Sequence, residues 1–261
     1  MAYPALTDLA TFIAVLSTGV LVPFLFSATL KMRPKTVTFV QHKKQAMLSL
    51  VVFSVSFLAT FGIYGFYDKI WVRTTLTADP VYVLRAAIAI MILLLPTIVA
   101  LRFSRQGLAD VALTQQNLRK NFAFGALTSI VIVLVLGVAS PNLGGGFAGF
   151  SVATIFLLLS YVVIAFGEEL VFRGYIQTRL VVNNGALVGV GGASLLYALY
   201  NVPLGFFCYG GDIGLALVYG AWRVSTGLVY GYIFHRSQNI VPSIIVHIFL
   251  VWGGLLFSLY L

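Results

Sequence analysis

Two adjacent acids, Glu168 and Glu169, are the only glutamates in the 261-residue sequence. They follow residues 151–166, a long apolar run without a charged side chain. A carboxylate in or beside the core of a lipid bilayer costs roughly 2.5 to 3.5 kcal/mol on insertion scales, so ionisable residues in such a place indicate a functional site by default. These two glutamates are therefore the first candidates for chemistry.

Helical spacing separates the two acids. At about 100° per residue, Glu169 and Arg173 lie on one face of a helix, whereas Glu168 points well away from that arginine. We expect Glu169 to stay ionised beside its guanidinium partner. Glu168 lacks that partner, so desolvation makes it a candidate for general acid or base chemistry near neutral pH. A salt bridge that only fixes two helices is the alternative interpretation, and it stays open.

The composition indicates a membrane protein. Hydrophobic residues make up 60% of the chain and charged residues 9%, and the mean hydropathy is +1.01. This predicts an all-α, polytopic transmembrane helix bundle. A span needs about 20 mostly apolar residues, and this rule predicts about eight spans: 9–30, 46–67, 82–101, 122–139, 151–166 continuing helically through 179, 186–207, 213–234 and 240–260.

The basic residues gather in alternate loops. The net charge is +9, and the loop cations are Lys31, Arg33, Lys35, Lys43 and Lys44, then Arg102, Arg105, Arg119 and Lys120, then Arg236. This is the positive-inside pattern, which places those loops in the cytoplasm. Because no groove of basic and aromatic residues accompanies the charge, nucleic acid is not an expected partner. We expect a multi-pass integral protein of a prokaryotic-type cell membrane.

A turn-rich segment at residues 141–146 is the best internal boundary. It predicts N-terminal transmembrane scaffold helices over 1–140 and a functional core over 141–261. The single cysteine, Cys208, excludes an intrachain disulfide and a cysteine-based metal cluster.

The other polar residues at membrane depth lie mostly in this second half. Tyr197 and Asn201 are one helical turn apart, and His247 lies in the last span. Arg223 cannot be deprotonated and requires an anionic or carbonyl partner, for which Glu168 is an obvious candidate. A lone intramembrane histidine is more often a packing residue than a catalyst, and Asn201 also fits a role in joining helices.

Three segments together resemble a known protease family. They are residues 168–174 (EELVFRG), 194–201 (SLLYALYN) and 244–247 (IIVH). Their order is similar to the Glu-Glu-x-x-x-Arg, aromatic-x-x-x-His and His-x-x-x-Asn motifs of the CPBP family, the CAAX proteases and bacteriocin-processing enzymes also called the Abi family. The resemblance covers about residue 151 to the end of the chain.

The resemblance implies a role for each matching residue. Glu168 would be the base that activates water, with the residue of the second motif. Glu169 and Arg173 would support it structurally, and His247 would stabilise the oxyanion of the tetrahedral intermediate. Peptide hydrolysis needs both a base and such preorganised donors.

The sequence departs from the family pattern at two positions. Asn201 stands where the second motif has histidine, and Val251 stands where the last motif has asparagine. An asparagine can orient water but cannot take its proton, and the loss of one oxyanion donor costs roughly 10²- to 10³-fold in rate. The candidate catalytic residues are Glu168, Glu169, Arg173, Asn201 and His247.

Three functions remain in view. The first is a glutamate-dependent intramembrane endopeptidase that hydrolyses a membrane-associated or lipid-anchored peptide. The second is a catalytically silent scaffold of the same fold that binds a partner without cleavage. The third is a transporter, which usually carries inverted repeats that this sequence lacks. The expected partners are membrane lipid, a hydrophobic or lipidated peptide or protein substrate, and a membrane protein.

The sequence offers few side chains that could bind a metal ion. A catalytic zinc ion usually takes three protein ligands, and only His247 and the two glutamates are expected near one another. We expect no cofactor and no tightly bound metal, although the sequence does not exclude a metal.

Overall fold

The computed structural model describes residues 9–32, 39–71, 80–139 and 151–256. In these ranges the chain is helical and contains no strand. The helices are α1 (Leu9–Thr29), α2 (His42–Trp71), α3 (Pro80–Phe103), α4 (Leu118–Ala139), α5 (Val152–Glu169), α6 (Thr178–Asn184), α7 (Ala186–Cys208), α8 (Ile213–Ser237) and α9 (Ile240–Leu256). A 3₁₀ turn, η3 (Leu108–Val111), follows α3, and a π-helical segment, η5 (Leu170–Gln177), joins α5 to α6.

These helices lie at the eight predicted places, because α5, η5 and α6 form one continuous 33-residue helix, Val152–Asn184. Five helices are long and apolar enough to cross a membrane: His42–Ile63, Pro80–Phe103, Leu118–Val135, Val152–Asn184 and Ala186–Cys208. Two more apolar stretches, Leu16–Thr29 and Ile240–Trp252, are shorter. The prediction of an all-α polytopic membrane fold is confirmed. The predicted break at 141–146 lies outside the described residues.

The outer surface of the bundle is apolar, as lipid contact requires. Large hydrophobic side chains such as Leu21, Met47, Leu84 and Leu134 are exposed on different helices. A water-soluble monomer rarely exposes so many of them over one surface. The molecule is an integral membrane protein.

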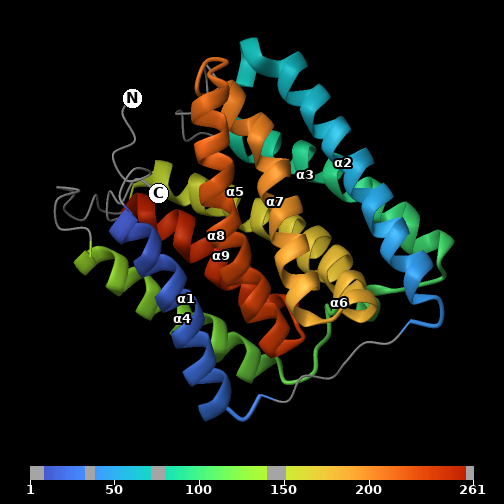
Figure 1. Ribbon diagram of the computed structural model, residues 1–261. Coiled ribbons are helices and arrows are strands. Elements are labelled where there is room, and N and C mark those ends of the chain that lie inside the picture. Colours follow the sequence, from blue (N-terminus) through green and yellow to red (C-terminus); the bar gives the residue numbers. More distant parts are fainter. Residues whose placement is uncertain (1–8, 33–38, 72–79, 140–150, 257–261) are drawn as a thin grey trace.

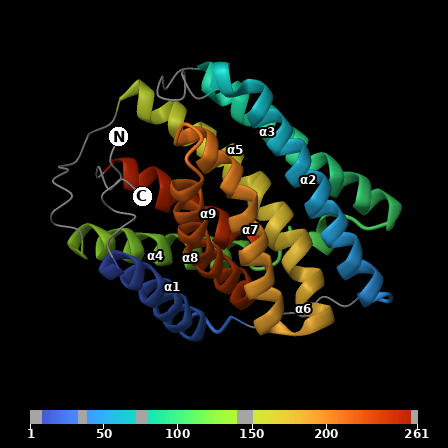
Figure 2. The same cartoon turned by 45° about the horizontal axis from the view of Figure 1, so that its top comes forward.

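The helices of the second half occupy the centre of the bundle. α2 pairs with α3 on one side, α1 pairs with α4 on the other, and α5, α7, α8 and α9 lie between the two pairs (Figures 1 and 2). The closest association is between α7 and α8. The first four helices therefore flank the central ones from two sides, and the predicted division near residue 140 stays a prediction.

Two glycines explain how closely α8 approaches α7 and η5. Gly227 and Gly231 are one turn apart, and a Cβ on Gly227 would lie 3.1 Å from the Ser194 Cβ. A Cβ on Gly231 would lie 2.8 Å from the Gln177 Oε1. Small residues at this spacing let helix backbones pack closely in membranes. The carbonyl groups of both glycines thereby become acceptors for side chains of η5.

The η5 segment has wider turns than the α-helix that the sequence analysis assumed for these residues. The Thr178 N–H donates to the Arg173 carbonyl five residues earlier, and the Thr178 hydroxyl donates to the same oxygen at 3.1 Å. Gly174 allows η3 to pack against this segment, since a Cβ there would lie 2.6 Å from the Val111 carbonyl oxygen. π-helical turns are rare and frequently occur at functional sites.

Candidate active site

A buried cluster of acid, base and cation forms where η5 meets α9. Glu169 stands at its centre: its Oε2 lies 3.4 Å from the Arg173 Nε, and its Oε1 lies 3.1 Å from the His247 Nδ1. The side chains of Glu169 and Arg173 are 0% exposed. The predicted pairing of these two residues is therefore present, and His247 adds a contact from a distant part of the chain.

Glu168 takes a different position from its neighbour. Its Oε2 lies 3.8 Å from the His247 Nε2, beyond direct hydrogen-bond length, and its side chain is 10% exposed. The Tyr197 hydroxyl interacts with the same carboxyl group. Because Glu169 is fully enclosed, Glu168 is the more accessible acid of this pair.

The two carboxyl groups fix the orientation of the imidazole between them. An ionised Glu169, held by Arg173, can only accept a hydrogen bond, so we assign the Nδ1 proton of His247 to that contact. The Nε2 atom is then directed at Glu168. A histidine oriented through one nitrogen and reactive through the other is a recurrent catalytic arrangement.

Aromatic rings enclose the cluster. The Arg173 guanidinium lies 4.6 Å from the Tyr197 ring centroid and 5.5 Å from that of Tyr230. Its Nη2 donates to the Gly227 carbonyl at 3.3 Å. The Tyr230 ring also stacks on His247, with centroids 4.6 Å apart and an interplanar angle of 18°. These contacts hold both Arg173 and His247 in one rotamer.

Asn201 is buried one turn after Tyr197 on α7, and its Nδ2 donates to the Tyr197 carbonyl at 2.9 Å. In the part of the chain that the structure describes, it makes no hydrogen bond to Glu168 or His247. Val251 is partly buried on α9, one turn after His247. The structure thus brings four of the five predicted site residues into one cluster and places Asn201 beside it.

Arg223 is a second cation near the cluster. Its guanidinium hydrogen-bonds to the Tyr219 hydroxyl and lies 4.8 Å from the centroid of that ring. It interacts electrostatically with Glu168, but within the described residues no direct ion pair joins them. With both glutamates ionised and His247 neutral, the two arginines balance the two carboxylates, which suits a site inside a membrane.

Sequence reasoning missed several contributors to this site. It did not predict that the ring of Tyr230 stacks on His247. It gave no role to the Gly227 carbonyl, for which the only signal was the Gly227 and Gly231 spacing. Tyr219 lies one turn before Arg223 in the sequence, but the expected partner of this arginine was an acid or a carbonyl group.

A metal ion would need ligands that this region does not gather. Over the described ranges, no group of three or more His, Cys, Asp or Glu side chains is arranged to hold a metal ion. The expectation of a metal-free site stays a prediction.

Comparison with known proteins identifies the segment that carries these residues. A family model described as type II CAAX prenyl endopeptidase Rce1-like matches residues 149–253. This range includes all five predicted site residues. Comparisons with curated proteins and with solved structures found no match.

Proposed function

Because residues 149–253 belong to the type II CAAX prenyl endopeptidase Rce1-like family, which is part of the CPBP or Abi group, we propose that the chain is an intramembrane endopeptidase. Its substrate would be a membrane-associated or lipid-anchored peptide. The observation that carries the proposal is the meeting of Glu168 and His247 in a buried cluster, with their facing atoms 3.8 Å apart.

Glu168 and His247 can share one water molecule. An oxygen about 2.8 Å from each facing atom fits a separation that is too long for a direct hydrogen bond. Glu168 would take a proton from this water as its oxygen attacks the peptide carbonyl carbon. The same proton would then pass to the leaving nitrogen as the carbon–nitrogen bond breaks, giving a carboxylic acid and an amine.

His247 is suited to stabilise the intermediate. If neutral His247 takes up one further proton from solvent at Nε2, its imidazolium would donate from both ring nitrogens, one to Glu169 and the other to the developing oxyanion. Glu169 and Arg173 would act as positioning residues, since neither needs to touch the substrate. Their complete burial supports this role, because it excludes them from the surface that Glu168 reaches.

The two departures from the family pattern affect rate more than geometry. Asn201 cannot share the proton transfer as a histidine would, and Val251 supplies no donor. The cluster around Glu168 is nevertheless intact, and the Tyr197 hydroxyl and Arg223 both interact with the Glu168 carboxyl group. We infer a slow hydrolase in which Glu168 is the sole base.

The test uses the purified full chain in liposomes with two probes, a prenylated CAAX peptide and a hydrophobic peptide of the same sequence without the lipid. Mass spectrometry would identify the fragments. We expect cleavage by the natural protein and a loss of at least about 10²-fold in Glu168→Gln, the usual contribution of a general base.

Asp212→Asn is the matched control for this substitution. It removes the same charge from an exposed position where the side chain accepts from the Leu215 N–H as a helix cap, and asparagine caps helices equally well. We expect unchanged turnover. Cleavage by Glu168→Gln at the natural rate would refute Glu168 as the base, and no cleavage of either probe by the natural protein would favour a silent scaffold.

A further inference from the structure

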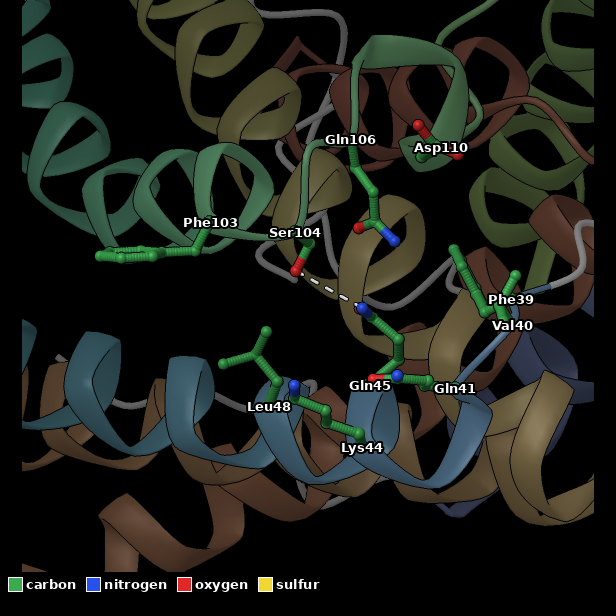
Figure 3. Close-up of a pocket in the computed structure, with 10 residues that line it drawn as sticks. All are labelled: Phe39, Val40, Gln41, Lys44, Gln45, Leu48, Phe103, Ser104, Gln106 and Asp110. Carbon is green, nitrogen blue, oxygen red and sulfur yellow. Dashed lines mark hydrogen bonds between the residues drawn. The ribbon is translucent and has the colours of Figure 1, made fainter.

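A second polar site lies away from the Glu168 cluster, where the start of α2 faces the connection between α3 and η3 (Figure 3). The structure has a pocket of about 630 Å³ there. Its polar lining comes from Gln41 just before α2, from Lys44 and Gln45 on α2, and from Ser104, Gln106 and Asp110 after α3. The proposed hydrolysis uses none of these residues.

A buried cation lies behind this lining. Arg179, on α6, is 0% exposed. Its guanidinium donates to the Gln45 Oε1 at 3.3 Å, to the Gln106 Oε1 and to the Tyr175 carbonyl at 2.9 Å. The Tyr175 ring centroid lies 3.5 Å from the guanidinium carbon. All these partners are neutral, and over the described ranges Arg179 has no carboxylate within ion-pair distance.

The arginine determines which way the two carboxamides point. Arginine can only donate, so Gln45 and Gln106 must turn their oxygens toward Arg179 and their NH₂ groups away from it. The Gln45 NH₂ group reaches the Ser104 hydroxyl at a long 3.4 Å, as Figure 3 shows. The pocket is therefore lined by hydrogen-bond donors, with the Lys44 ammonium at its edge and a buried positive charge behind.

Asp110 is the one acid in the lining. Its carboxylate accepts from the Gly107 N–H at 2.8 Å and interacts with Arg179 over a longer range. With Lys44 and Arg179 against Asp110, the balance of charge at the pocket is positive. Donors and positive charge together suit an anionic group such as a phosphate.

An apolar groove continues from this pocket between α2 and α3. It has a volume of about 370 Å³, and its walls include Val51, Val55, Leu95 and Val99. Leu48 and Phe103 line both the groove and the polar pocket. Both helices are long and apolar enough to cross a membrane, so an apolar groove between them suits an acyl chain of the bilayer.

We propose that the pocket and the groove form one binding site for an anionic phospholipid of the surrounding bilayer. The headgroup phosphate would accept from Gln45, Gln106, Ser104 and Lys44, and an acyl chain would lie between α2 and α3. The groove favours a lipid over a soluble anion, because an inorganic phosphate would leave it uncovered. This site is independent of the proposed hydrolysis.

Native mass spectrometry of the full chain in a neutral detergent tests the proposal. The probes are phosphatidylglycerol, phosphatidylcholine with the same acyl chains, and inorganic phosphate alone. We expect retention of phosphatidylglycerol over phosphatidylcholine and no displacement of the lipid by phosphate. Equal retention of the two lipids would overturn the proposal, and displacement by phosphate would show a site for a soluble anion.

Two lysines of the same bundle end provide matched variants. Lys44→Ala should weaken phosphatidylglycerol binding about fivefold, the effect of one lysine near an anionic lipid surface. Lys120→Ala removes the same charge from a different pocket, lined by Lys31 and Asn117, and should leave binding unchanged. Equal effects of the two substitutions would mean that general surface charge causes the preference for phosphatidylglycerol. That result would contradict a specific site.

Two further variants separate the headgroup from the acyl chain without removing Arg179. Gln106→Glu gives Arg179 a carboxylate partner and cancels the net positive charge of the pocket, so the preference for phosphatidylglycerol should disappear while thermal stability is kept or raised. Val99→Trp fills the groove and should weaken both lipids alike. Retained phosphatidylglycerol binding in a folded Gln106→Glu protein would refute the headgroup assignment.

Discussion

The two adjacent glutamates should respond in opposite ways to the same substitution. Glu169→Gln removes the carboxylate that contacts both Arg173 and His247, at 3.4 Å and 3.1 Å. Glu168→Gln removes a carboxyl group whose contact with His247 is 3.8 Å long. The first change should destabilise the fold, and the second should impair hydrolysis while leaving the fold intact.

The magnitudes follow from burial. Arg173 is fully enclosed, and breaking a buried ion pair by removing one partner costs about 3 to 5 kcal/mol, because the other charge is left uncompensated. At Glu168, a long contact is lost but one buried charge is also removed, and Arg223 keeps its bond to Tyr219. We expect a clearly smaller cost there than at Glu169, because no fully enclosed partner charge is left uncompensated.

The assay is unfolding of the purified chain in mixed micelles, with the free energy of unfolding measured for each variant. A double variant, Glu169→Gln with Arg173→Met, removes both partners of the ion pair. It should be more stable than the sum of the single effects predicts, by at least about 1 kcal/mol, as expected for residues in direct contact. Strict additivity, or equal destabilisation by Glu168→Gln and Glu169→Gln, would refute the assignment of a structural and a reactive acid.

Other predictions concern the helix packing and the site. Gly174→Ala would place a Cβ 2.6 Å from the Val111 carbonyl oxygen and should lower the free energy of unfolding by about 1 to 3 kcal/mol. Gly62→Ala is the control, because a Cβ there would have nothing within 4 Å. It should raise the free energy of unfolding by about 0.5 to 1 kcal/mol. Asn201→His restores a group that can take a proton and should raise turnover in liposomes at least about tenfold; unchanged turnover would deny that position a role. Tyr230→Leu removes the ring stacked on the imidazole. It should lower turnover about two- to tenfold, from roughly 0.5 to 1.5 kcal/mol of lost stacking, with helix content by circular dichroism unchanged. Natural turnover in this variant would contradict the role of stacking.

The helices could be predicted closely from the sequence because each is a long apolar run between polar or glycine-rich segments. The ranges 9–30 and 186–207 correspond to Leu9–Thr29 and Ala186–Cys208 in the structure. The wide turn of η5 could not be predicted in this way. It coincides with the packing of Gly174 against the carbonyl group of Val111, which is a contact between segments far apart in the chain.

The site was predictable where it depends on local spacing. Glu169 and Arg173 pair because they are one turn apart, and this contact is present. The sequence could not show that His247 binds Glu169 more closely than Glu168, because that depends on how α9 packs against α5. The catalytic roles of these residues stay predictions, and they rest on the geometry of the cluster.

The central claim is that Glu168 and His247 act as one unit on a shared water, and a double-mutant cycle on turnover tests it most directly. Residues that act as a unit give non-additive losses. Glu168→Gln, His247→Gln and the double variant should each lose turnover of the lipid-anchored peptide to a similar extent, about 10²- to 10⁴-fold. If the double variant loses the product of the two single factors, or if either single variant retains the natural turnover, the claim is contradicted.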